Sequence, residues 1–388
     1  MPQDVMDKWL KSKKFAQVNG VKLKPVKNPI YPDIALSTQK GQSEAFCCVC
    51  EAGEQLIVKK FNNGKELNTD YLNSVSALLP RHEAFRAGTN RQILSATMVK
   101  RASGYYYTAE LSKCLDGTIL MPRIDGLDWA SVAEEIRQDR IPLDKNMRVK
   151  FAINLADLVA ILEAHGCCHR DISSGNVFII LTSGMIYLID FDSLYHPCLT
   201  IPKATTCGTA GYSPPFAWGI DGLDAKRTWC PYADRYAMAI IIVEFLTLDK
   251  GSPLTAEGGM FSQDELCARR GKSLENIRKL LVRNYPQIVQ LFDSVINSRD
   301  FQTCPSPQDW QQSLEKIFLA DDIKPPALNC IKDDYKECFQ KIISKVRPAA
   351  PLWPAPRLSD IPPINLELPK VSSFRITLPP DPWKTGRL

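Results

Sequence analysis

The sequence predicts an α+β protein built of two lobes, a small sheet-rich lobe followed by a larger helical lobe. The length of 388 residues exceeds the usual size of one compact domain. Runs typical of strands dominate residues 31–124, and helical spacing of apolar residues dominates residues 125–320. We therefore expect four parts, a basic arm (1–30), a sheet-rich lobe with its connector (31–124), a helical lobe (125–320) and a proline-rich tail (321–388).

The basic arm accounts for the net charge of the chain. It holds seven Lys and two Asp, which equals the formal net charge of +5, so the remainder is balanced. Its apolar residues fall on one helical face: Val5, Met6, Trp9 and Leu10. Such a segment suits an acidic partner or a membrane surface, or it packs its apolar face on its own domain, which we favour.

Four runs predict strands in the small lobe: "AFCCVC" (45–50), "EQLIVKKF" (54–61), "YYYTAEL" (105–111) and "GTILMPRI" (117–124). Asp116-Gly117 is typical of a hairpin turn between the last two runs. Apolar residues at helical spacing predict one helix over residues 71–79.

In the large lobe, apolar spacing predicts a long helix over residues 147–164, and "NVFII" and "MIYLIDF" predict two short strands. The tail from Pro325 contains 12 of the 28 prolines, which predicts an extended segment. It would dock on a partner's aromatic groove or on its own lobe, with Trp353 and Trp383 as anchors.

Composition argues against several classes of protein. The thirteen cysteines are predicted to be reduced, and the lone pair Cys47 and Cys50 reads as strand residues rather than a zinc site. No secretory signal is visible, and the longest apolar run, 236–248, is too short to span a membrane, so we expect a soluble cytoplasmic protein. Basic residues are not interleaved with aromatic ones, so we expect no nucleic-acid partner.

One ordered set of residues has the chemistry of phosphoryl transfer. Lys59 follows the strand run "LIV", Asp171 and Asn176 lie in "HRDISSGN", and Asp190 begins "DFD". In this arrangement Lys59 would neutralise the phosphates of ATP, Asp171 would accept the proton of the acceptor hydroxyl, and Asn176 and Asp190 would bind Mg²⁺. Alternation along the strand favours Lys59 over Lys60. Either aspartate alone would suit a turn cap, but their joint spacing with Asn176 makes that reading improbable.

Over residues 31–320 these motifs resemble those of the eukaryotic-type (Hanks-type) protein kinase family. Besides "LIVK" and "HRDISSGN", the similar segments are "GTAGYSPP", "DRYAMAIII" with Asp234 as its anchor, and "CPSPQDWQQSL". The resemblance implies the bilobal kinase fold and an ATP- and Mg²⁺-dependent kinase acting on serine or threonine of a protein substrate, itself included. "LMPRIDG" and "IDFDSLY" most resemble bacterial kinases of the helix-hairpin-helix-associated group, which often have a phosphatase partner; we find no helix-hairpin-helix appendage in the sequence.

The resemblance also implies where the nucleotide binds. Adenine would lie against the connector Ile119–Ile124, near Met121 and Arg123, because Pro122 has no N–H. The family covers the phosphates with a glycine-rich loop, whereas "TQKGQSEAF" offers only Gly41. Lys59 and Asn176 would complete the nucleotide contacts.

Several positions depart from the family pattern. Asp192 replaces the glycine of "DFG", Ser173 replaces a phosphate-facing lysine, and no glutamate partner for Lys59 is evident, since Glu66, Asp70 and Glu83 are poorly placed. Asp192 would recruit metal or hinder rearrangement of its segment. A buried glutamate–arginine pair of the family is replaced by Pro215 and Cys304, which suits a remodelled but stable lobe.

These departures leave two alternatives to a protein kinase. One is a pseudokinase used as a nucleotide-binding or scaffolding module. The other is a small-molecule phosphotransferase, since "IDFD" also resembles aminoglycoside and choline kinases, although these lack "GTAGY".

A loop within the helical lobe is a candidate for self-modification. Thr205 and Thr206 would carry a phosphate that pairs with Arg170 or Lys203; an ordinary flexible loop explains these threonines equally well. Thr209 in "GTAGY" suits serine or threonine acceptors.

Overall fold

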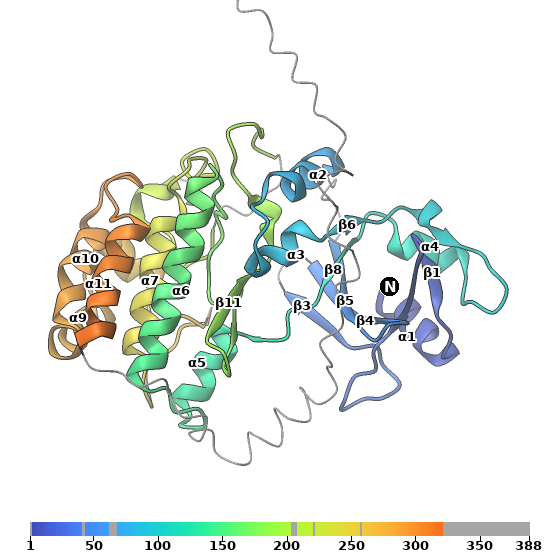
Figure 1. Ribbon diagram of the computed structural model, residues 1–388, viewed down its shortest axis with the longest axis horizontal. Coiled ribbons are helices and arrows are strands. Elements are labelled where there is room, and N and C mark those ends of the chain that lie inside the picture. The colour runs from blue at the N-terminus through green and yellow to red at the C-terminus, as the bar shows by residue number, and fades with distance from the viewer. Residues whose placement is uncertain are drawn as a thin grey trace, which may run out of the picture. The chain divides into compact units, whose positions relative to one another are not determined.

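The chain combines a curled antiparallel sheet with a group of helices, which confirms the α+β class (Figure 1). The computed structural model describes residues 2–40, 43–61, 68–202, 208–219, 222–256 and 258–320. All of these residues belong to one compact unit, Met1–Arg347.

The first half of the chain forms an eight-stranded sheet. Its strands are β1 (Ala16–Val18), β2 (Val21–Pro25), β3 (Ser37–Lys40), β4 (Ser43–Cys50), β5 (Gln55–Phe61), β6 (Gln92–Ile93), β7 (Val99–Lys100) and β8 (Ile119–Pro122). The order is β6-β8-β5-β4-β2-β1-β7, and β3 also pairs with β4. One edge of β4 is shared, because β3 pairs with its residues 43–46 and β2 with its residues 48–50. Cys47 and Cys50 are buried strand residues of β4 with free thiols.

The N-terminal residues belong to this sheet, so no structural boundary falls at residue 30. Helix α1 (Pro2–Ser12) precedes β1 and β2, and it packs against β2 and α4. Met6 and Trp9 are fully buried there, and the carboxylate of Asp7 accepts a hydrogen bond of 2.7 Å from the N–H of Ala35. The apolar face of the expected arm is thus covered by its own domain, because burial of these two side chains is favourable.

The strand predicted over residues 105–111 is wrong, because a helix begins inside it. Helix α4 covers Ala109–Leu115, and the hydroxyl of Thr108 caps it by accepting from the N–H of Leu111 at 3.0 Å. The predicted hairpin turn at Asp116-Gly117 is wrong for the same reason. Gly117 has φ +65° just after the helix, where a glycine commonly ends a helix, and the chain then enters β8.

Short helices complete this half of the chain. They are α2 (Thr69–Leu78), the 3₁₀ helix η1 (Glu83–Phe85), α3 (Arg86–Thr89) and the 3₁₀ helix η2 (Ala96–Met98). The predicted helix over residues 71–79 is confirmed as α2. Asn68 starts this helix by accepting from the N–H of Tyr71, which satisfies one of the free donors of the first turn.

The second half is mainly helical, with α5 (Trp129–Arg137), α6 (Lys145–Ala164), α7 (Asp234–Thr247), α8 (Gln263–Ala268), α9 (Lys272–Asn284), α10 (Pro286–Asn297) and α11 (Pro307–Ala320). Figure 1 shows α6, α7, α9, α10 and α11 side by side, and α6 contacts both α7 and α11. Helix α7 is almost wholly buried and mostly apolar, as expected of a central helix, with Asp234 and Glu244 as its buried acids. The long helix predicted over residues 147–164 is confirmed as α6.

Three strands interrupt the helices and carry part of the candidate site. Strands β9 (Leu127–Asp128), β10 (Val177–Ile180) and β11 (Met185–Leu188) form a small antiparallel sheet, which confirms the two strands predicted in this half. The remaining elements are the hairpin β12 (Trp218–Gly219) and β13 (Gly222–Leu223) and the 3₁₀ helices η3 (Phe191–Ser193) and η4 (Pro215–Ala217). No helix of the described residues is long and apolar enough to cross a membrane. The tail and its two tryptophans lie outside the described residues.

Candidate active site

The hairpin of β10 and β11 brings Asn176 close to Asp190. Its register pairs Val177 with Leu188, so the residues just outside the two strands lie opposite each other. The N–H of Ile189 donates to the carbonyl of Asn176 at 3.1 Å, and Asp190 follows directly. Fourteen residues apart in sequence, the two predicted metal ligands thus become neighbours because two apolar runs pair in antiparallel register.

Lys59 reaches the same place from the large sheet. Its side chain is buried, with 7% of its surface exposed, and its ammonium contacts Asp190 Oδ1 and donates to Asp192 Oδ2 at 2.7 Å. Lys60 points elsewhere and donates to the carbonyl of Asp116 at 2.7 Å. The alternation along β5 therefore predicted correctly which of the two lysines faces inward.

Asp171 lies beside this group with both of its carboxylate oxygens hydrogen bonded. Thr209 donates its hydroxyl to Oδ1 at 2.8 Å, and Asn176 donates its amide to Oδ2 at 3.1 Å. Burial raises the pKa of Asp171 to about 6, a shift that the nearby Asp190 carboxylate increases and the bond from Thr209 opposes. The raised pKa is closer to the pKa of a proton acceptor that works near neutral pH.

The oxygens that remain suit a hard cation. The amide nitrogen of Asn176 is used by the carbonyl of Asp171 at 2.8 Å and by its carboxylate, which leaves the amide oxygen for a ligand. Asp190 adds a carboxylate whose Oδ1 contacts Lys59 and which lies beside the carboxylate of Asp192; burial, with Asp192 adding to it, raises the pKa of Asp190 although Lys59 opposes the shift. Mg²⁺ prefers oxygen ligands of these types, completed by phosphate and water oxygens.

Asp234, the first residue of α7, holds the loop that carries Asp171. Its two carboxylate oxygens accept from the backbone N–H groups of His169 at 2.6 Å and of Arg170 at 2.7 Å. Arg170 has φ +66° and Asp190 has φ +67°, a left-handed conformation that is uncommon for residues other than glycine. Such strained residues persist where surrounding bonds hold them, and they concentrate at functional sites.

Arg170, one of the two residues expected to pair with a loop phosphate, lies among backbone carbonyls. Its buried guanidinium donates to the carbonyls of Ser193 at 2.9 Å, Thr228 at 3.0 Å and Ala225 at 3.1 Å, and it stacks on Trp229. These contacts tie together the segments on either side of residues 203–207. That loop, which contains Lys203, Thr205 and Thr206, lies outside the described residues. The expected pairing of a loop phosphate with Arg170 or Lys203 stays a prediction.

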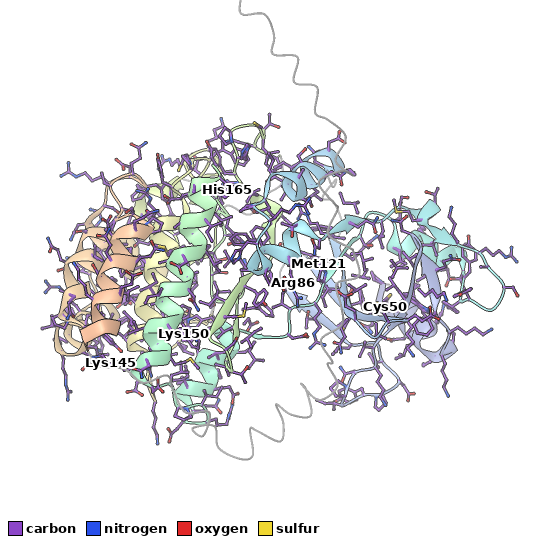
Figure 2. All side chains as sticks on the ribbon, in the orientation of Figure 1. Cys50, Arg86, Met121, Lys145, Lys150 and His165 are labelled. Atoms are coloured by element: carbon purple, nitrogen blue, oxygen red, sulfur yellow. The ribbon has the colours of Figure 1, made fainter. Side chains whose placement is uncertain are left out.

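The connector expected to hold adenine is β8 and the residues after it. Arg86 and Met121, labelled in Figure 2, lie where the large sheet meets the helical half, and Arg86 donates to the carbonyl of Arg123 at 3.1 Å. The N–H of Arg123 donates to the carbonyl of Gln55 at 3.1 Å, so it does not face a ligand as expected.

The next backbone donor along the connector is available. Within the part of the chain that the structure describes, the N–H of buried Ile124 donates to no other group. Gly41, the other predicted nucleotide contact, lies outside the described residues.

Phe191, the middle residue of "DFD", packs in the core and holds the segment that carries Asp190 and Asp192. It is buried between Phe85, with ring centroids 5.9 Å apart, and His169, with centroids 4.7 Å apart. Gly88 makes this possible, since a Cβ there would lie 2.6 Å from the Phe191 ring. Beyond Phe191, the carbonyl of Leu194 accepts from the hydroxyl of Tyr71 in α2 at 2.6 Å.

The positions that depart from the kinase pattern have local explanations. Ser173 is buried, and its carbonyl accepts from the N–H of Asn176 at 3.0 Å, so it serves the turn and supplies no cation. Near Pro215 and Cys304 the two segments are joined by an edge-on contact of Phe216 and Phe301 at 4.9 Å, an apolar substitute for a buried ion pair.

Asp192 binds two cations, Lys59 and Arg91. Burial by itself would raise the pKa of Asp192, but Lys59 and Arg91 outweigh it and hold the pKa below its usual range. Sequence reasoning missed Arg91, because "GTNRQIL" carries no signal that distinguishes this arginine from a surface one.

The site as a whole collects an ammonium, three carboxylates and an amide from both halves of the chain. All four residues singled out as an ordered set in the sequence, Lys59, Asp171, Asn176 and Asp190, take part in it. A comparison with protein-family models finds no match, and a comparison with curated proteins finds none either.

Proposed function

We propose that the protein is an ATP- and Mg²⁺-dependent protein kinase with the bilobal kinase fold that transfers the γ-phosphate to serine or threonine of a protein substrate. The observation that carries the proposal is the convergence of Lys59, Asp171, Asn176 and Asp190, from β5, the loop before β10 and the end of β11. Residues from three separate segments meet in the combination that phosphoryl transfer requires.

Each side chain has a distinct part in this chemistry. Asp171 would orient the acceptor hydroxyl and accept its proton, held in place by the bonds from Thr209 and Asn176. Lys59 would neutralise phosphate charge in a buried setting, where electrostatic stabilisation is stronger than in water. Asn176 and Asp190 would hold Mg²⁺, which when bound neutralises charge on the phosphate oxygens.

The connector supports a specific way of holding adenine. Ile124 is a buried residue whose N–H has no partner among the described residues, and a ligand acceptor would satisfy this donor. We therefore assign the adenine donor to Ile124 in place of Arg123, with Met121 lining the site.

A protein acceptor is favoured by the segment "GTAGYSPP", which small-molecule kinases lack. Thr209 in this segment bonds directly to Asp171, so the segment borders the reacting group. A pseudokinase remains the second candidate, supported by Ser173, which is buried in a turn where the family usually supplies a lysine.

The test is transfer of labelled phosphate from ATP with Mg²⁺ to the protein itself and to a generic protein substrate. The wild type should incorporate label. Asp171→Ala should transfer phosphate about 10²–10⁴-fold more slowly, since that is the usual contribution of a positioned proton acceptor. Glu163→Gln is the control, since Glu163 pairs with Arg235 between α6 and α7 rather than with any of the four site residues. Incorporation that is equal in wild type and Asp171→Ala would refute the proposal, and nucleotide binding without any transfer would establish the pseudokinase.

A further inference from the structure

The carboxylate of Asp192 lies between two cations that come from different segments. Lys59 Nζ donates to Oδ2 at 2.7 Å, and Arg91 Nη1 donates to Oδ1 at 2.8 Å. The side chains are shielded from water, with 19% of Asp192 and 3% of Arg91 exposed. Each oxygen of Asp192 therefore has a cationic partner, and the two cations fix the direction of this carboxylate beside that of Asp190.

The remaining donors of Arg91 hold helix α2. Its Nη2 donates to the carbonyl of Leu72 at 2.9 Å, and its Nε donates to the hydroxyl of Ser76 at 3.1 Å. A guanidinium is planar and rigid, so these bonds fix the direction of the group that meets Asp192. Helix α2, Arg91, Asp192 and Lys59 therefore form one continuous chain of charged and polar contacts.

This chain supplies a counter-charge that α2 itself does not. Asp70, the acidic residue of α2, is exposed, and Glu83 pairs with Arg86 at 3.2 Å. Among the described residues, the acids that contact Lys59 are Asp190 and Asp192. Among the described acids, Asp192 is thus the one that pairs with Lys59 without also being a candidate metal ligand.

We propose that Asp192 and Arg91 are positioning residues that hold Lys59 toward the nucleotide and make its position depend on helix α2. In protein kinases, phosphoryl transfer requires an ion pair between this lysine and a glutamate of a helix. Here the carboxylate comes from the third residue of "DFD", and an arginine outside the helix makes the link. This inference rests on the proposed function, because it assigns the nucleotide as the group toward which Lys59 is held.

The experiment measures the affinity for a fluorescent ATP analogue with Mg²⁺, together with kcat/KM for ATP, in the full-length protein. Asp192→Asn keeps the shape of the side chain but removes its charge, and we expect about tenfold weaker nucleotide binding, within the usual range for contacting charged residues. Arg91→Lys keeps the charge beside Asp192 but cannot also bond Leu72 and Ser76, and we expect a smaller loss of about threefold.

A double-mutant cycle separates positioning from a general loss of structure. If Asp192 acts through Lys59, then Asp192→Asn should change nucleotide affinity little in a Lys59→Met background. Glu163→Gln is the matched control, because it removes a similarly shielded ion pair, to Arg235 at 2.7 Å, in the helical half. It should lower the melting temperature without changing nucleotide affinity.

The outcomes distinguish the two proposals. If the wild type binds and transfers phosphate while Asp192→Asn behaves like Glu163→Gln, the inference is refuted and the proposed function stands. The inference is also refuted if Asp192→Asn weakens binding equally with and without Lys59, since its effect would then not pass through the lysine. A wild type that binds no nucleotide would overturn both.

Discussion

Asp234 carries the loop of the candidate site, and its replacement should be costly. The carboxylate of this buried residue accepts two backbone N–H groups, those of His169 and Arg170, at 2.6 and 2.7 Å. In Asp234→Ala both donors lose their acceptor, and a buried donor left unsatisfied costs about 1–3 kcal/mol. The two together predict a loss of about 2–6 kcal/mol, a large part of the roughly 5–15 kcal/mol by which native proteins are stable.

Asp234→Asn provides an intermediate case. Its amide oxygen still accepts from one N–H, while its NH₂ group faces the other donor, so we expect a loss of about 1.5–3 kcal/mol, the value of one charge-assisted bond. Both variants should also lower phosphate transfer, since Arg170 is held at φ +66° by these bonds and Asp171 follows it.

Urea denaturation followed by fluorescence measures these free energies of unfolding. The matched control is Asp224→Ala, because Asp224 also accepts a backbone N–H, that of Lys226 at 2.9 Å, but at the exposed surface. The control should lose less than about 1 kcal/mol. If Asp234→Ala is no more destabilised than Asp224→Ala at an unchanged m value, buried acceptor loss does not explain how this loop is held.

Three further predictions concern other parts of the chain. Burial raises the pKa of Glu244 to about 7. Its proton is therefore retained to higher pH in the folded state, and its contribution to stability should fall by up to roughly 3 kcal/mol as pH rises from about 4.5 to about 7; melting curves should fall more steeply with pH in the wild type than in Glu244→Gln, whose remaining slope comes from groups such as Asp171. Gly88→Ala places a methyl group against Leu79 and the ring of Phe191, so it should cost about 1–3 kcal/mol and weaken nucleotide binding; an unchanged melting temperature would contradict the packing. Lys59→Met should abolish phosphate transfer in the label assay. Lys60→Met should leave transfer unchanged and should change the free energy of unfolding by less than about 0.5 kcal/mol, as judged from melting curves.

The errors of the sequence reading share a cause. "YYYTAEL" has strand-forming residues, but the Thr108 cap and the helical run after it outweigh that preference. The first thirty residues look like an arm because their lysines are visible in the sequence, while the pairing of β1 and β2 with the large sheet is not.

The sequence by itself determined the α+β class, the helices α2 and α6, the strands β4, β5, β8, β10 and β11, and the choice of Lys59 over its neighbour. These features follow from periodicity and alternation, which are local properties of the chain. Tertiary structure alone decided that Asp192 pairs with Lys59 and Arg91 and that Arg123 turns its N–H away from the site. Such pairings depend on which groups folding brings within about 3 Å of each other, and hydrogen bonds and buried ion pairs have no signature in residue order.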